Sequence, residues 1–247
     1  MLMSRTISSI QVGSEKDWSG PPYLSIDIDW AHDEVLADTI DLVEEYRVPV
    51  TWFITHNTPL LARLRSHPDF ELGIHPNFNF LLSGDGRTGR DAVEVVDRLM
   101  TIVPEAKSVR SHSTTQNSGL LDLFASRGLT HECNVFIPVQ ANIVLKPWRL
   151  WSGLTRVPYS WEDDVACLFG PHGDWPMNQL IAQQGIKVFD FHPMHVFLNT
   201  EHMDRYDKTR EWHRSPQELR THRHQGEGTR TRFLEFLRLM SSVRLMQ

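Results

Sequence analysis

The chain alternates between two hydrophobic patterns. Short runs such as 23–29, 49–54 and 186–191 are rich in β-branched and aromatic residues, which indicates buried strands. Between these runs, apolar residues recur three or four positions apart, which is the spacing of a helix with one buried face. The pattern predicts strands over 23–29, 49–54, 70–74, 107–110, 130–134, 155–158 and 186–191, and helices over 33–46, 58–66, 90–102, 118–127, 178–184 and 230–244.

Strands that alternate with helices along a chain predict a parallel α/β sheet with right-handed crossovers. The seven strands expected here are one short of the standard eight-unit barrel. The length fits one domain over residues 1–247 better than two small ones. One segment, 201–232, is rich in Arg, His and Asp and poor in apolar residues. We expect it to be a solvated excursion, ordered or not, before the last helix, and the alternative is a lid or a partner contact.

Composition removes several classes of function. The net charge is 25 − 31 = −6, which disfavours a general nucleic-acid binder, because such proteins neutralise phosphates with excess Lys and Arg. Two cysteines are too few for a disulfide scaffold. The chain has no secretory leader and no long apolar run, so we expect a cytoplasmic protein without stable membrane insertion. A chain that had lost its leader would look the same.

Ionisable side chains lie where the predicted strands end. In parallel α/β barrels the reactive groups occupy the carboxyl ends of the strands, so these residues are expected to meet at one mouth. Neither a nucleotide-binding glycine loop nor the GxSxG or HExxH motif is present. The strand-end residues are Asp27 and Asp29, His75, Arg110 and His112, Trp161, Asp163 and Asp164, and His192.

Among the strand-end residues, Asp27 and Asp29 indicate a functional site most strongly. If both lie on a strand, residues two apart face the same side and the two carboxylates are close together. Two charges of like sign that close are costly unless a cation lies beside them. The structural alternative is that one of these residues caps the helix that starts near Asp33.

His75 and Asn79 are four positions apart, which on a helical turn places both on one face. Imidazole suits zinc, whereas an amide oxygen is a weaker and harder ligand. A lone His after a strand is often only a hydrogen-bonded structural residue. Its combination with Asp29 favours a metal ligand.

Arg110 and His192 supply the complementary charges. An Arg directed at a carboxylate site can hold one Asp ionised through bidentate hydrogen bonds, and the alternative is a surface ion pair. His192 follows an apolar strand and shares a side with Asp190. A partly buried His is the usual general acid near neutral pH. His195 is a second candidate, and the alternative for His192 is a core residue bonded to the backbone.

In this order, the motifs resemble those of the polysaccharide deacetylase superfamily (NodB-like proteins, carbohydrate esterase family 4). The family's Thr-Phe-Asp-Asp is matched by 25–29 (SIDID), which has an extra residue between the acids. Its second motif is matched by 70–79 (FELGIHPNFN), with an Asn where the family has its second His. Arg110 matches the third motif, 161–164 (WEDD) loosely matches the Asp-Trp motif, and 191–193 (FHP) matches the fifth.

The resemblance covers roughly 23–199 and looks closest to deacetylases of bacterial surface-polysaccharide (O-antigen) biosynthesis. It implies a distorted (β/α)7 barrel and a divalent metal, commonly zinc. Asp29, His75 and Asn79 would hold that metal.

The resemblance also assigns the acid–base groups. Asp27 would be the general base, and Arg110 would hold it in its ionised form. His192 would be the general acid, oriented by Asp163 or Asp164.

Asn79 departs from the family pattern. A neutral amide binds zinc less tightly than imidazole does. The site therefore binds metal weakly, prefers a harder ion, recruits another residue such as His32 or His112, or has lost activity.

Together these residues predict a metal-dependent hydrolase that removes N-acetyl groups from a sugar or polysaccharide precursor. The expected partner is thus an N-acetylated carbohydrate and not a nucleic acid. One alternative is a related hydrolase of another non-peptide C–N bond. The other is a non-catalytic carbohydrate-binding protein that keeps the fold.

Overall fold

The protein is built around one curved, mostly parallel sheet. The structure is a computed structural model that describes residues 5–169 and 175–245. Its strands are β1 (Tyr23–Asp27), β2 (Val50–Ile54), β3 (Phe70–Ile74), β4 (Ser108–Val109), β5 (His131–Glu132), β6 (Trp148–Arg149), β7 (Thr155–Arg156), β8 (Trp161–Glu162) and β9 (Val188–Phe191). They pair in the order β6-β7-β5-β4-β3-β2-β1-β9-β8, and β6 alone among these nine runs antiparallel to its neighbour.

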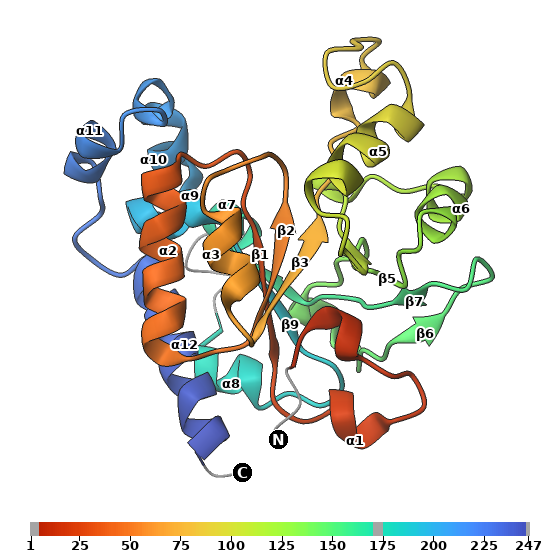
Figure 1. Ribbon diagram of the computed structural model, residues 1–247. Helices are drawn as coiled ribbons and strands as arrows, with labels where there is room; N and C mark the ends of the chain where they lie inside the picture. Colours follow the sequence, from red (N-terminus) through yellow and green to blue (C-terminus); the bar gives the residue numbers. More distant parts are fainter. Residues whose placement is uncertain (1–4, 170–174, 246–247) are drawn as a thin grey trace.

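Helices cover the sheet on its outer side. In Figure 1, α2, α9 and α12 gather beside β1, and α5 and α6 lie beyond β3. The α-helices are α1 (Glu15–Trp18), α2 (Asp33–Tyr46), α3 (Leu61–Ser66), α4 (Asn79–Leu82), α5 (Ala92–Ile102), α6 (Ser118–Ser126), α7 (Asp163–Phe169), α8 (Met177–Ile181), α9 (Pro193–Leu198), α10 (Met203–Lys208), α11 (Pro216–Thr221) and α12 (Thr229–Leu245). Short 3-10 helices are η1 (Ile7–Ser9), η2 (His112–Thr114), η3 (Val139–Ala141) and η5 (Arg210–Trp212).

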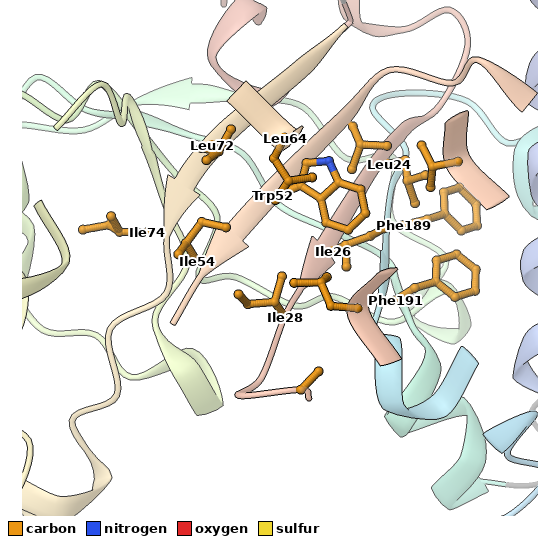
Figure 2. Close-up of a cluster of buried hydrophobic side chains, with 14 of the residues drawn as sticks. Leu24, Ile26, Ile28, Trp52, Ile54, Leu64, Leu72, Ile74, Phe189 and Phe191 are labelled. Carbon is orange, nitrogen blue, oxygen red and sulfur yellow. The ribbon is translucent and has the colours of Figure 1, made fainter. Parts of the chain in front are cut away.

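Alternation along the central strands separates the core from the site. Leu24 and Ile26 of β1 and Phe189 of β9 join the outer core, which Figure 2 shows around Trp52. Each such buried large side chain contributes roughly 1.5–3 kcal/mol. The intervening residues of β1 and β9 point to the inner side of the curved sheet. Polar groups lie there next to a second cluster of buried apolar side chains. The strands thus deliver polar side chains to the inside of the curl.

The sheet is a curled half-barrel. Its edge strands, β6 and β8, do not pair with each other in the described sheet. A parallel bridge between Phe136, after β5, and Tyr159, before β8, draws the two sides together. The rings of these two residues lie 5.1 Å apart. The prediction of an α/β fold with a distorted barrel is confirmed, with nine strands where seven were expected.

The two additional strands were missed for different reasons. The segment 141–153, expected to be irregular, contains β6, which is only two residues long and exposed. β8 lies between the predicted sixth strand and the next helix, and it is also two residues long. Neither is long enough to show a period in the sequence.

The segment 201–232 is folded into short helices and packs on the barrel. The Tyr206 ring of α10 lies 5.0 Å from the ring of His195, and Leu219 of α11 is fully buried. Arg230 forms an ion pair with Asp38 of α2. The segment is thus ordered, and its charged side chains are exposed or half-buried. Within the described residues, no helix combines the length and the apolar character needed to span a membrane.

Candidate functional site

Five of the six predicted site residues lie around one pocket of about 270 Å³. They come from four separate strands, so the expected meeting of strand ends is found. Asn79 is not among the residues that line the pocket. His112, which the sequence offered only as an alternative ligand, does line it. The residues concerned are Asp27, Asp29, His75, Arg110, His112 and His192.

Asp27 and Asp29 reach the pocket by different routes. Asp27 is the last residue of β1, whereas Asp29 lies beyond the strand with a left-handed φ of 36°. Trp30 also has a positive φ, of 54°, and its backbone N–H donates to Thr55 Oγ1 at 3.1 Å. The prediction that both acids share one face of a strand is therefore wrong, since a tight turn directs Asp29 into the pocket. Neither acid caps α2, whose first turn is capped by His32.

His75 stands between the two acids. Its Nδ1 lies 3.4 Å from Asp27 Oδ2, and its Nε2 lies 3.3 Å from Asp29 Oδ1. The backbone N–H of His75 donates to Ile54 O at 2.9 Å, which fixes the end of β3 against β2. Residues 75–78 are not helical, so His75 and Asn79 do not share a helical face as predicted. Pro76 disfavours a helical conformation for the residue before it.

His112 completes a triangle of donor atoms. Its Nδ1 lies 3.4 Å from Asp29 Oδ1 and 3.3 Å from His75 Nε2. The third side, between Asp29 Oδ1 and His75 Nε2, is 3.3 Å. His112 belongs to η2, directly after β4, and its ring lies edge-on to Trp30 at 5.2 Å. Its place after a strand end was the one sequence signal that pointed to it.

This triangle fits a divalent metal of the zinc type. In four-coordinate sites zinc lies about 2.0–2.1 Å from His nitrogens and carboxylate oxygens, so the edges of the coordination tetrahedron are about 3.3–3.4 Å. The three edges found here have these lengths. A set of two imidazoles and one carboxylate is also the usual chemistry of a three-ligand catalytic zinc site with a fourth position open.

The charges around the triangle also favour a cation. Burial raises the pKa of Asp29, but hydrogen bonding to His112 and His75 outweighs it, so the net pKa lies well below its usual range. Burial lowers the pKa of His75, but the charge of Asp27 and the bond to Asp29 leave it raised. The two ring nitrogens lie 3.3 and 3.4 Å from Asp29 Oδ1, and within the described residues no donor meets this buried atom with regular hydrogen-bond geometry. These atoms are thus placed to hold positive charge.

Arg110 joins the two buried carboxylates of the barrel. One nitrogen, Nη1, donates to Asp27 Oδ1 at 3.0 Å and also to Asp190 Oδ1. Nη2 donates to Ser25 Oγ at 2.9 Å. Burial lowers the pKa of Arg110, but Asp190 and Asp27 raise it well above its ordinary value, so the group stays charged. The expected bidentate pair with one Asp is therefore replaced by one guanidinium shared between two.

Aromatic rings hold the guanidinium in place. Its central carbon lies 4.7 Å from the centre of the Phe53 ring and 4.3 Å from that of Tyr159. A cation over a ring face in a dry site is worth roughly 2 kcal/mol. Arg110 is 1% exposed, so this attraction is little screened by solvent.

His192 is fixed by Asp163 and not by Asp164. Its Nδ1 lies 2.7 Å from Asp163 Oδ1, and its backbone N–H donates to Asp163 Oδ2 at 2.9 Å. Asp164 instead accepts from the backbone N–H of Val165. The Nε2 of His192 faces the pocket and lies 3.7 Å from Asp29 Oδ2. Burial lowers the pKa of His192, but the charge of Asp163 and its hydrogen bond raise it well above the ordinary value.

A comparison with models of known protein families finds a match over most of the chain. A family model described as WbmS-like polysaccharide deacetylase matches residues 24–210. The chain belongs to this family. A comparison with curated proteins found no match.

One solved structure with high sequence identity agrees with membership in the WbmS-like family. A structure of WbmS from Bordetella bronchiseptica, described as a candidate polysaccharide deacetylase involved in O-antigen biosynthesis, matches with 46% identity and a TM-score of 0.90. The match covers 95% of this chain and 96% of that one. A candidate polysaccharide deacetylase from Mycobacterium smegmatis matches with 16% identity and a TM-score of 0.47, over 91% of this chain and 86% of that one.

In this WbmS-like chain, further acids line the pocket beside His192. Glu162 Oε2 lies 3.1 Å from the Tyr159 hydroxyl, and Asp164 is also part of the wall. Burial and the neighbouring charge of Asp164 raise the pKa of Glu162 well above its usual range. Burial raises the pKa of Asp190 to about 7. The segment that loosely matches the fourth family motif thus places two carboxyl groups, those of Glu162 and Asp164, in the wall of the pocket.

Proposed function

We propose that this chain is a metal-dependent hydrolase that removes N-acetyl groups from a sugar or polysaccharide precursor. The observation that carries the proposal is the meeting of Asp29 and His75 with Asp27 and His192 around one pocket. A hydrolase of an amide needs a water, a base for its proton, charge stabilisation and an acid for the leaving amine. The pocket has a group suited to each of these tasks.

Asp29 and His75 would hold the metal, which we propose to be zinc. A divalent metal at that position supplies Lewis-acid polarisation of the acetyl carbonyl and lowers the pKa of a nearby water. Asn79 was the third ligand implied by the family resemblance, but it is not among the residues that line the pocket.

Asp27 is the proposed general base. Its Oδ1 is held by Arg110 at 3.0 Å, which fixes the carboxylate and balances its charge. The buried setting, with 2% of Asp27 exposed, keeps bulk solvent away from the carboxylate. Asp27 would accept the proton of the attacking water, and Arg110 would hold the carboxylate in orientation while it does so.

His192 is the proposed general acid. Asp163 accepts the hydrogen bond from Nδ1, so the proton available for transfer is on Nε2, the atom that faces the pocket. A raised pKa keeps this imidazolium protonated at neutral pH. His192 would give that proton to the departing sugar amine.

We further propose that the substrate is an N-acetylated carbohydrate on the route to a surface polysaccharide and that the enzyme acts in the cytoplasm. The support for the route is the 46% identity to WbmS, whose description names O-antigen biosynthesis. A non-catalytic carbohydrate-binding protein was suggested only by Asn79. The acid–base pairs around Arg110 and His192 favour catalysis instead.

The test is acetate release from N-acetylated sugars and oligosaccharides by the purified chain with added zinc or cobalt. Loss of the base is expected to lower kcat by about 10²–10⁴-fold, so Asp27→Asn should be nearly inactive. Asp122→Asn, an exposed change on α6, is the control and should retain full activity. No release by the wild type, or undiminished release by Asp27→Asn, would refute the proposal.

A further inference from the structure

Asn79, at the position where the family has its second His, does not line the pocket that contains the triangle of donor atoms. Asn79 is exposed and begins α4. Its side-chain Nδ2 donates to Ser113 Oγ at 3.0 Å, and its backbone N–H donates to Asn77 Oδ1 at 2.9 Å. The side chain of Asn79 therefore bonds to the residue that follows His112.

The turn that carries His112 has an unusual backbone. Ser113 and Thr114 both have left-handed φ angles, of 54° and 51°, although neither is glycine. Such conformations are strained for non-glycine residues and persist where the surroundings enforce them. Two hydrogen bonds do so here: His112 N–H donates to Pro76 O at 2.9 Å, and Asn79 holds Ser113.

We propose that His112 replaces the family's second His as the third metal ligand, and that Asn79 is a positioning residue that holds the turn bearing His112. This inference rests on the proposed metal-dependent function and adds the identity of the third donor to it. His112 forms a triangle with Asp29 and His75 whose edges are 3.3, 3.4 and 3.3 Å, and this geometry supports His112 as the third ligand.

The close contact between the loop after β3 and the turn after β4 explains how His112 can replace the family's second His. The loop after β3 and the turn after β4 are adjacent, because Arg110 N–H donates to Ile74 O and His112 N–H donates to Pro76 O. A ligand supplied by the second loop can therefore reach the same point as a ligand supplied by the first. Asn79 then supports the donor from outside, as residues behind a metal ligand commonly do.

The experiment measures the zinc affinity of the full chain by competition with a chromophoric chelator. Removal of a true ligand is expected to weaken binding by more than about 100-fold, and removal of a supporting hydrogen bond by about tenfold. His112→Ala should show the larger loss. Asn79→Ala and Ser113→Ala should show the smaller one, and the double variant should lose no more than either single variant, since both remove one bond.

Cobalt absorption gives a second readout that a general loss of stability would not produce. Cobalt bound to Asn79→Ala should keep the wild-type d–d bands, because the donor atoms are unchanged. Cobalt bound to His112→Ala should lose or shift them, and His112→Gln provides a second variant if the alanine form does not fold. His202→Ala changes an exposed His outside the pocket and should match the wild type in both measurements.

The inference is overturned if Asn79→Ala weakens zinc binding as much as His112→Ala while Ser113→Ala has no effect. It is also overturned if His112→Ala binds zinc as the wild type does. Acetate release is measured in parallel with the metal-loaded wild type. An absence of release with the predicted order of affinities refutes the hydrolase function alone, whereas a wild type that binds no zinc refutes both.

Discussion

Asp163 holds His192 at two points. One carboxylate oxygen lies 2.7 Å from Nδ1 of the ring, and the other accepts the backbone N–H at 2.9 Å. Both the position and the orientation of the imidazole are therefore set by one side chain at the start of α7. The free edge of the ring is directed into the pocket.

The first prediction concerns this pair. Asp163→Asn should lower kcat by about 10–100-fold, because an amide neither stabilises the imidazolium nor fixes its proton on Nε2. KM should change little. Steady-state kinetics check this, with Asp122→Asn as the control, since Asp122 is exposed on α6 and lies outside the pocket. An equal loss of kcat in the two variants would contradict the assignment.

The same pair predicts a pH dependence. Because the pKa of His192 is raised above its ordinary value, the imidazolium is present at neutral pH and is lost only as the pH rises through that raised value. The alkaline limb of the kcat profile should therefore lie above the ordinary His pKa of about 6.5. In Asp163→Asn the limb should move to lower pH. A limb that stays in place would show that another group is the acid.

Asp190 is expected to matter through Arg110. It shares the guanidinium with Asp27 and accepts from Ser25 Oγ at 2.7 Å. Asp190→Asn keeps an oxygen that can accept both bonds, whereas Asp190→Ala keeps none. We expect kcat to fall by about tenfold or more for the alanine variant and by less for the asparagine variant. Equal activity of the alanine variant and the wild type would exclude a role for Asp190.

Sequence patterns predicted the longer regular elements well, and the short elements and turns poorly. The helix over 33–46 and the strand over 70–74 have the predicted bounds, because each carries several periods of one pattern. The left-handed turn at Asp29 has no such signature. That turn, and not strand alternation, brings the second acid to the metal triangle.

The candidate site was predictable in part for the same reason. Residues at the ends of strands or directly after them, such as Asp27, His75 and Arg110, met as expected. The roles proposed for His112 and Asn79 depend on how two loops lie against each other, which involves contacts between residues 34 or more positions apart. Asp163 and Asp164 are adjacent in the sequence, and only one of them faces β9. The sequence does not show which of the two does, because both residues are the same type of acid.

The outer core gives a stability prediction. Trp52 is 0% exposed, and its Nε1 has no hydrogen-bond partner within the described residues. Trp52→Ala should cost about 3–5 kcal/mol of unfolding free energy. Trp52→Phe should cost less than about 1.5 kcal/mol, because it keeps most of the volume and removes an unpaired donor. Urea denaturation checks both, and similar losses would contradict this view of the core.

Gly73 should tolerate no side chain. A Cβ there would lie 2.5 Å from Ser108 Oγ and 2.8 Å from the Phe53 ring, because β3 and β4 pack closely over the polar interior. Gly73→Ala is expected to cost about 1–3 kcal/mol or more in unfolding free energy. Gly13→Ala, with nothing within 4 Å of its Cβ, is the matched control. Equal stability of the two variants in thermal denaturation would argue against the packing described.

The central claim is that a water, activated at the site of Asp29 and His75, cleaves the acetamide. The most direct measurement is mass spectrometry of acetate released from an N-acetylated sugar in ¹⁸O-labelled water, with metal-stripped and zinc-reloaded enzyme. We predict acetate with one ¹⁸O atom from the reloaded enzyme and almost none from the stripped enzyme. Equal release without metal, or no labelled acetate from the zinc-loaded enzyme, would contradict the account.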